Sequence, residues 1–397
     1  MTPPARFAAA IEIIDQVLAG RPAEKALLTW FRAHRFAGSK DRVAIRDIVF
    51  SLERRRASCA AMGRADPDHV TGRAILRGYL AQEGLAEDTV FGAGGYGPAK
   101  IAPEAPPVRP FSNLDSATRA DLQPWIWVRM RAQYGEGASG LAEALRHRAP
   151  IWLRVNTARI SPEAARLRLR EEGFEAALSA DCPGAIEITG GGRRPASVGQ
   201  SPVITEGLAE FQDLGPQRAM AWLPLRPGMR ALDYCAGGGG KSLALAAKGA
   251  RVTAHDADPA RMKDLPARAA RAGAEIARKS ALRDARFDLV LCDVPCSGSG
   301  AWRRAMANKW SLTPQELSAF AARQRDIVLK ALRHAKPGGL FAYMTCSLFA
   351  EENAAQGAWI SRAHRLISER QFTPLDGSDG FYVVVFEVED AALHNPW

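Results

Sequence analysis

The stretch RALDYCAGGGGKS, residues 230–242, decides the fold of this chain. An apolar strand ends in Asp233, four glycines follow from Gly237 to Gly240, and a helical pattern then runs through Ala247. In open α/β sheets, ligands bind beyond the carboxyl ends of the strands. Glycines at such a turn let the backbone approach a ligand, and the start of the following helix favours negative groups. The stretch therefore predicts an α/β domain with a ligand at this turn.

Three classes of ligand compete for the glycine turn. A Walker A loop needs glycine five residues before Gly240, where Cys235 stands, and a dinucleotide fingerprint starting at Gly237 needs glycine where Ser242 stands. A nucleoside without a pyrophosphate, such as S-adenosylmethionine, remains. The next strand ends in Asp256, in the place of an acidic residue that accepts hydrogen bonds from ribose hydroxyls. The alternative is a glycine-rich turn with purely structural caps.

Strand-like and helical runs alternate from residue 207 to the end of the chain. This order predicts a mostly parallel, Rossmann-like α/β sheet with helices on both faces. We expect this domain to cover residues 207–397. Its expected strands are residues 230–233, 251–255, 287–293, 340–345 and 381–388.

Two of these strands end beside a cysteine. In FDLVLCDVPCSGSG, residues 287–300, the strand ends in Asp293, and Cys296 follows on a turn where a thiolate could act. Cys292 lies inside the strand and is expected to be a small core residue. In GGLFAYMTCSLFAEEN, residues 338–353, Cys346 follows the strand end, and we expect residues 351–353 to begin the next helix. Both cysteines should therefore lie at one edge of the sheet.

Two other uses of paired cysteines fit the sequence less well. A metal site would want further Cys or His ligands at ligand spacing, and none stands near Cys296 or Cys346. We therefore expect no metal. A redox pair would be expected to show a C-x-x-C pattern, which is missing here.

The part of the chain before residue 207 divides into two predicted regions. Residues 1–140 read as an all-helical domain, with a Gly- and Pro-rich linker or surface loop near residues 91–113. Residues 141–206 read as a small α+β module, with strands at 151–157 and 185–189, a helix from Ser161 to Leu169, and a basic turn at 190–200.

Composition sets limits on the class of protein. The 397 residues are 47% hydrophobic and 24% charged, which is typical of a globular protein. No run of about 18 apolar residues predicts a membrane span, and Glu12 and Asp15 interrupt the N-terminal apolar stretch, so we expect no secretory signal. Six irregularly spaced cysteines favour a reducing compartment, so we expect a cytoplasmic protein.

The formal net charge of +10 favours a polyanionic partner such as nucleic acid. Codon bias in an Ala- and Arg-rich proteome is the alternative explanation of this charge. One expected helix carries five arginines, which form either an RNA-facing stripe or a solvated face: Arg42, Arg46, Arg54, Arg55 and Arg56.

Taken together, these segments resemble the Nol/Nop/Sun family of RNA cytosine-5 methyltransferases over about 250 residues. The helical N-terminus resembles the NusB-like RNA-binding domain of the RsmB subgroup, mainly through DRVAIRDIVF at residues 41–50. The family segments in this chain are RVNT (154–157), GLAEFQD (207–213), the glycine loop, DADPAR (256–261), DVPCSGSG, NKW (308–310), TCS, EEN and DGFYVVVF (379–386).

The resemblance implies a function for each strand-end residue. It implies that Cys346 attacks cytosine C6, that Cys296 assists release, and that Asp293 hydrogen-bonds the N3/N4 edge of a flipped-out base. It also implies an S-adenosyl-L-methionine cofactor, an RNA partner with 16S ribosomal RNA favoured, and a monomer. The implied cofactor-binding residues are Cys235, Ala236, Gly237, Gly238, Gly239, Gly240, Lys241, Asp256 and Asp293.

Departures from the family pattern keep other readings open. The family loop reads C-A-A-P-G-G-K-T, whereas this chain reads C-A-G-G-G-G-K-S, and Asn308 stands where Asp is common. Lys279 and Ser280 stand where the family carries an Asp near the adenine. The alternatives are a tRNA cytosine-5 methyltransferase, or a non-catalytic RNA-binding assembly factor that kept the fold. A dehydrogenase is opposed by the broken dinucleotide fingerprint.

Overall fold

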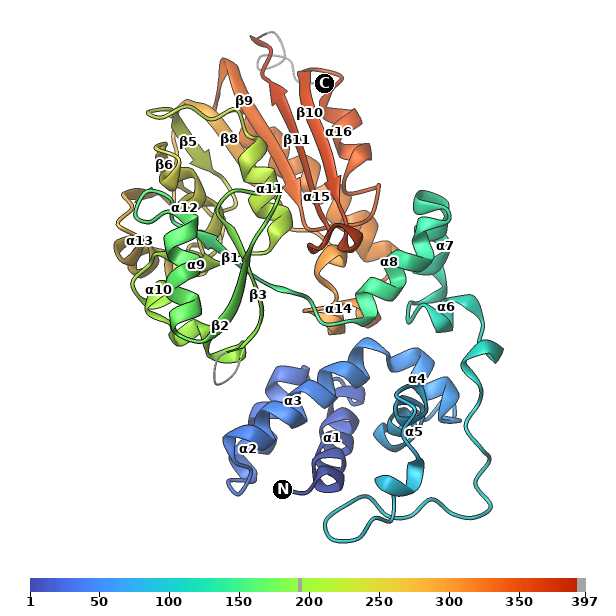
Figure 1. Cartoon of the computed structure of the whole chain (residues 1–397). Helices are drawn as coiled ribbons and strands as arrows, with labels where there is room; N and C mark the ends of the chain where they lie inside the picture. The colour runs from blue at the N-terminus through green and yellow to red at the C-terminus, as the bar shows by residue number, and fades with distance from the viewer. Residues whose placement is uncertain (192–194, 391–397) are drawn as a thin grey trace. The chain divides into compact units, whose positions relative to one another are not determined.

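The computed structural model describes residues 1–191 and 195–390, so the expected basic turn at 190–200 lies partly outside the described residues. The chain folds into two compact units (Figure 1). The first comprises Met1–Arg148 and Trp302–Leu312, and the second comprises Ala149–Ala301 and the residues from Thr313 onward. The division into three domains at residues 140 and 206 stays a prediction. In the described part of the chain, no helix is long and apolar enough to cross a membrane.

The first unit is built of helices, as expected. Helix α1 begins where the Thr2 hydroxyl accepts a hydrogen bond from Ala5 N, and its apolar residues Ile13 and Ile14 are buried in a core shared with the other helices. The stretch 91–113 is irregular except for a 3-10 turn at Phe111–Asn113. The helices are α1 (Pro3–Leu18), α2 (Ala23–Ala33), α3 (Ser39–Arg54), α4 (Arg56–Met62), α5 (Gly72–Gln82), α6 (Ser116–Arg119), α7 (Pro124–Tyr134), α8 (Gly137–Arg146) and α14 (Met306–Ser311).

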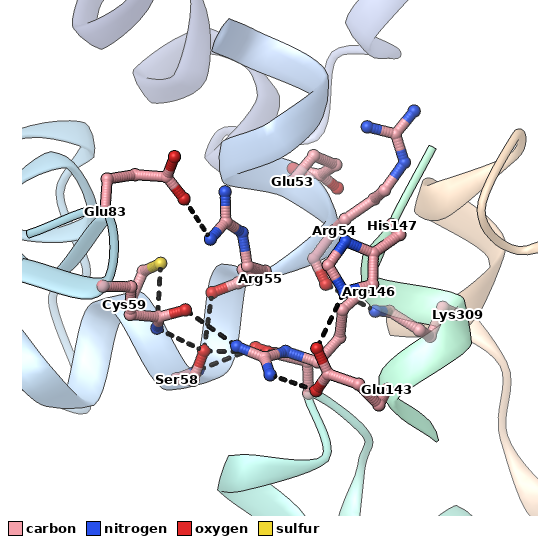
Figure 2. A network of polar contacts seen from close by, with 12 residues as sticks. Glu53, Arg54, Arg55, Ser58, Cys59, Glu83, Glu143, Arg146, His147 and Lys309 are labelled. Atoms are coloured by element: carbon pink, nitrogen blue, oxygen red, sulfur yellow. Dashed lines mark hydrogen bonds and ion pairs between the residues drawn. The ribbon is translucent and has the colours of Figure 1, made fainter. Parts of the chain in front are cut away.

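A buried polar network joins the helices of the first unit (Figure 2). Asp121 is fully buried and accepts hydrogen bonds from Ser58 N, Ser58 Oγ and Arg146 Nε, each at 2.8 Å. Lys309 of α14 donates a hydrogen bond to the carbonyl of Arg54 at 2.8 Å. Burial raises the pKa of Asp121 and lowers the pKa of Lys309 to about 8. The segment Trp302–Leu312 is thus part of the helical unit, although it follows the strand-end motif of Cys296 in sequence.

The second unit contains a seven-stranded sheet with strand order β10-β11-β9-β8-β5-β6-β7. Neighbouring strands pair in parallel along the series β9-β8-β5-β6-β7. Strand β11 is antiparallel to both of its neighbours, β10 and β9. The expected mostly parallel α/β sheet is therefore confirmed. The strands are β5 (Arg230–Asp233), β6 (Arg251–Ala254), β7 (Ile276–Arg278), β8 (Phe287–Asp293), β9 (Ala335–Thr345), β10 (Arg365–Phe372) and β11 (Phe381–Glu387).

Helices cover both faces of this sheet. Alternate residues of the central strands point to opposite sides, so each strand contributes to two cores. Val290 and Phe341 are buried in one core with residues of α15 (Pro314–Leu332) and α16 (Ala354–Ile360). Leu289 and Ala342 are buried in another core with residues of α11 (Leu214–Trp222) and α12 (Gly240–Ala247). Helix α13 (Leu265–Ala272) lies in the sequence between β6 and β7.

A separate four-stranded antiparallel sheet forms the small α+β module of the second unit. Its order is β2 (Phe174–Leu178), β3 (Ala185–Gly191), β1 (Ile151–Val155) and β4 (Ala209–Phe211). Helix α9 (Pro162–Glu171) starts at the Ser161 cap and buries Leu169 in a core with residues of β1 and β3. The short helix α10 (Pro202–Thr205) precedes β4.

Two sequence-based expectations need correction. Residues 351–353 do not begin a helix, because α16 starts at Ala354 and Asn353 is its N-cap. Instead, the side chains of Glu352 and Asn353 are buried in hydrogen-bond networks. Strands β2, β4, β7 and β10 were also not expected, since they are short or show mostly exposed and polar residues.

Candidate active site

The carboxyl ends of β5, β8 and β9 meet at one edge of the seven-stranded sheet, since these strands are parallel neighbours. Asp233 ends β5 and Asp293 ends β8, while Cys346 directly follows Thr345 at the end of β9. The turn after β8 brings Cys296 back toward Cys346, so that the two Sγ atoms lie 3.4 Å apart. The structure therefore brings together the three residues expected to be catalytic.

The two cysteines lie in different electrostatic surroundings. The hydrogen bond to Cys346 and burial raise the pKa of Cys296 well above that of an ordinary thiol. Either sulfur can be the donor in the contact between them. Cys346 is partly exposed, which is the accessibility that a nucleophilic sulfur requires.

Asp293 forms an ion pair with Lys241, the residue that follows the glycines, at an Nζ to Oδ2 distance of 2.5 Å. Burial disfavours the charged form of Lys241, but the attraction of Asp293 outweighs it and raises the pKa of the ammonium. The ammonium also lies 5.1 Å from the centre of the Phe381 ring. This pair joins the end of β8 to the start of α12 and places a carboxylate near the two sulfurs.

The glycine loop has a backbone that needs glycine at two positions. Gly237 and Gly239 have φ values of +49° and +83°, and a Cβ on Gly239 would lie 2.2 Å from Leu265 Cδ1. Asp256 braces the loop, because its Oδ2 accepts a hydrogen bond from Gly237 N at 2.9 Å. Ala236 N donates to the carbonyl of His255 at 2.9 Å. The loop is thus held by the two residues that directly follow β6.

Arg268 of α13 adds a support that the sequence did not predict. Its guanidinium donates to the carbonyl of Gly238 and forms an ion pair with Glu210 of β4 at 2.5 Å. A Cβ on Gly238 would lie 3.1 Å from Arg268 Nη1, so the missing side chain leaves the space that the guanidinium uses. The only signal in the sequence was the departure of Gly238 from the family loop.

Asp233 is a second residue that the sequence analysis left out of the site. It is 1% exposed, and its Oδ2 accepts a hydrogen bond from Ser242 Oγ at 2.7 Å. Its Oδ1 is buried without a hydrogen-bond partner among the described residues, and burial raises the pKa of Asp233 to about 6. Cys235 lies beside it, and burial raises the pKa of that thiol. A buried carboxylate oxygen without a hydrogen-bond partner at the glycine loop fits a ligand that carries a hydrogen-bond donor.

The end of β7 carries no carboxylate. Lys279 follows the strand directly, donates its N–H to the carbonyl of Ala254, and contacts the His255 ring through its own carbonyl. Asp284 comes later in the chain and is exposed. Asp256 follows β6 and Asp293 ends β8, whereas Lys279 and Ser280 follow β7. The roles of Asp256 and Asp293 in binding a cofactor are still predictions.

Two family models match parts of this chain. The family described as 16S rRNA methyltransferase RsmB/F matches residues 220–382, which include the glycine loop, Asp293 and both cysteines. The ferredoxin-like domain of RsmF/B-like methyltransferases matches residues 123–193. Both matches support the resemblance of this chain to the Nol/Nop/Sun family.

Proteins similar to this chain include ribosomal RNA small subunit methyltransferase B of Escherichia coli strain 536, which is 33% identical over 242 residues. That region is 58% of this chain and 56% of the relative. The protein of the same name from Erwinia tasmaniensis is 32% identical over 279 residues, 65% of this chain and 64% of the relative. The chain therefore matches less than two thirds of the length of either relative.

The fold of this chain also resembles a solved structure over nearly its whole length. The crystal structure of PH0851 superposes with a TM-score of 0.74 at 20% identity and covers 98% of this chain and 99% of that one. The family match supports S-adenosyl-L-methionine as the cofactor. One observation fits this cofactor, since Asp233 Oδ1 at the glycine loop is an acceptor without a hydrogen-bond partner among the described residues and could accept from an ammonium group. Asp256 instead uses both carboxylate oxygens to accept hydrogen bonds from the backbone, at Gly237 N and Asp258 N.

Proposed function

We propose that this chain is an S-adenosyl-L-methionine-dependent methyltransferase that forms 5-methylcytosine in RNA, with 16S ribosomal RNA as its substrate. The observation that carries the proposal is the separation of 3.4 Å between Cys296 Sγ and Cys346 Sγ, beside the Lys241–Asp293 ion pair. The two sulfurs are within hydrogen-bond distance of each other, which fits a nucleophile with an assisting group beside it.

The proposed reaction begins with attack of the Cys346 sulfur on cytosine C6. The S–C6 bond forms as the C5–C6 π electrons move toward C5, which makes C5 a nucleophile. We infer that Asp293, which pairs with Lys241, hydrogen-bonds the N3/N4 edge of the base and so stabilises the addition. When bound, S-adenosyl-L-methionine supplies the methyl group that C5 takes.

Release reverses the first step. The C5 proton passes to a base, the C5–C6 double bond forms again, and the S–C6 bond breaks, so that the sulfur leaves with its electron pair. The Cys296 thiol is positioned to hydrogen-bond this leaving sulfur. The target cytosine must lie outside a duplex for these protein groups to reach its C5 and C6 atoms. We therefore expect a flipped-out or single-stranded cytosine.

Single-turnover methylation of 16S ribosomal RNA tests the proposal. We expect Cys346→Ala to abolish formation of 5-methylcytosine, and we expect Cys296→Ala to accumulate a covalent RNA–protein adduct that is visible after denaturing electrophoresis. Normal methylation by Cys346→Ala would show that the assigned nucleophile is wrong. Transfer RNA run in parallel distinguishes the two substrate classes.

One observation favours a second candidate, a non-catalytic RNA-binding factor of the same fold. Lys279 and Ser280 stand where the family places an acidic residue near the adenine. Titration calorimetry with S-adenosyl-L-methionine separates the candidates. Saturable binding supports the enzyme, whereas no binding at roughly millimolar concentration, a free energy of about −4 kcal/mol, would favour the factor.

A further inference from the structure

Each of the two active-site cysteines is followed directly by a serine whose hydroxyl bonds to the same buried carboxylate. Ser297 Oγ and Ser347 Oγ each donate to Glu352 Oε2 at 2.5 Å. The two serines also lie 3.4 Å apart, between their Oγ atoms. Glu352 therefore connects the turn after β8 to the turn after β9.

The second oxygen of Glu352 is also fully engaged. Glu352 Oε1 accepts hydrogen bonds from Ser297 N at 2.8 Å and from Gln324 Nε2 at 3.0 Å. Glu352 is the acceptor in all four contacts. The side chain is 0% exposed, so loss of any of these donors would leave a buried oxygen unsatisfied, which is costly.

Gln324 of α15 extends the network to the backbone of both turns. Its Nε2 also donates to the carbonyl of Pro295 at 3.0 Å, directly before Cys296. Tyr343 Oη lies 2.7 Å from the carbonyl of Glu352 and 3.0 Å from Gln324 Oε1, and its single proton can be donated to either oxygen. The positions on both sides of Cys296 are therefore tied to the same carboxylate and amide.

We propose that Glu352 is a positioning residue that sets the separation of the Cys296 and Cys346 sulfurs by holding Ser297 and Ser347. This inference rests on the proposed function. Because each serine is adjacent to its cysteine, a shift of either hydroxyl moves the neighbouring Cα and sulfur. The negative charge of Glu352 also contributes to the raised pKa of Cys296, so the same residue helps to keep that sulfur protonated.

Methylation by Glu352 variants gives the first test. A displacement of about 1 Å can cost about 100-fold in rate. We therefore expect Glu352→Ala to lower the single-turnover rate about 100-fold and Glu352→Gln about 10-fold, while the Kd for S-adenosyl-L-methionine changes less than about 2-fold. Glu351→Gln, which removes a partly exposed carboxylate one residue away, is the matched control and should retain the wild-type rate.

Cross-linking of the two thiols gives a readout that does not depend on methyl transfer. Diamide removes two hydrogens and two electrons from a pair of close thiols, and peptide mapping then measures how fast the Cys296–Cys346 disulfide forms. We expect at least about 10-fold slower cross-linking in Glu352→Gln and in Ser347→Ala, since both lose a hydrogen bond that holds the turns. Alkylation of Cys296 in Glu352→Gln should also occur at lower pH, because a nearby negative charge is removed.

The outcomes are distinguishable. If the Cys296–Cys346 disulfide forms in Glu352→Gln and in Ser347→Ala as fast as in the wild type, the positioning role is wrong, even if the methylation rate falls. A wild-type protein that forms no 5-methylcytosine, together with slower cross-linking in the variants, would instead overturn the proposed function and leave the positioning role intact. If Glu352→Ala does not fold, Glu352→Gln and Ser347→Ala decide the question.

Discussion

Lys309 offers a prediction whose magnitude follows from the structure of the helical unit. The side chain is 1% exposed and donates to the carbonyl of Arg54. Burial lowers its pKa from 10.5 to about 8, although Asp121 and Glu53 oppose the shift. Because the pKa of Lys309 is lower in the folded chain, the unfolded chain binds more protons than the folded chain above pH 8. The stability that Lys309 contributes is therefore present at high pH and is lost as the pH falls through 8.

The expected change in the free energy of unfolding can be measured against the variant Lys309→Met, because the methionine side chain is of similar length and carries no charge. Between pH 7 and pH 10 we expect the free energy of unfolding of the wild type to rise by about 2.5 kcal/mol relative to the variant, from a pKa of 10.5 in the unfolded chain and about 8 in the folded one. Urea unfolding followed by circular dichroism at several pH values gives this difference. Parallel pH profiles for the two proteins would refute the assignment of Lys309 as a buried, poorly solvated ammonium.

Three further predictions concern the active site and RNA. Lys241→Met should lower the single-turnover methylation rate about 100-fold, because Asp293 loses the ammonium that holds it, and an unchanged rate would contradict this role. Arg268→Ala should raise the Kd for S-adenosyl-L-methionine about 10-fold in calorimetry, because the Gly238 carbonyl loses a charged hydrogen-bond donor. Arg271 pairs with Glu210 at 3.3 Å, and Arg271→Ala should change this Kd less. RNA binding should weaken at least about 10-fold between about 50 and 200 mM salt, and a flat salt profile in filter binding would show that the charge of +10 is not used on phosphates.

The sequence was enough to predict the centre of the sheet and the convergence of the site. Strands β5 and β8 occupy the residues expected for them, because buried parallel strands are continuous apolar runs with clear ends. Since parallel strands place their carboxyl ends at one edge, the meeting of Cys296 with Cys346 followed from the order of the motifs. The roles of these residues in catalysis are still predictions.

Contacts between segments distant in sequence were not predictable. The pairing of Arg268 with the Gly238 carbonyl joins α13 to the loop before α12, and no local pattern marks it. Glu352 looked like the first turn of a helix because Glu is common there, yet its side chain turns inward to the serines of both motifs. The placement of Lys309 in the helical unit likewise depends on tertiary packing, since a lysine in a short helix usually faces solvent.

The most direct test of the account is to trap the covalent intermediate on RNA that contains 5-fluorocytidine. Fluorine at C5 cannot leave as a proton does, so the S–C6 bond should persist once the methyl group has been transferred. With S-adenosyl-L-methionine present, we predict an RNA–protein adduct that peptide mapping assigns to Cys346, formed by the wild type and by Cys296→Ala but not by Cys346→Ala. An adduct assigned to Cys296, or methylation of ordinary RNA without any adduct on the fluorinated one, would contradict the account.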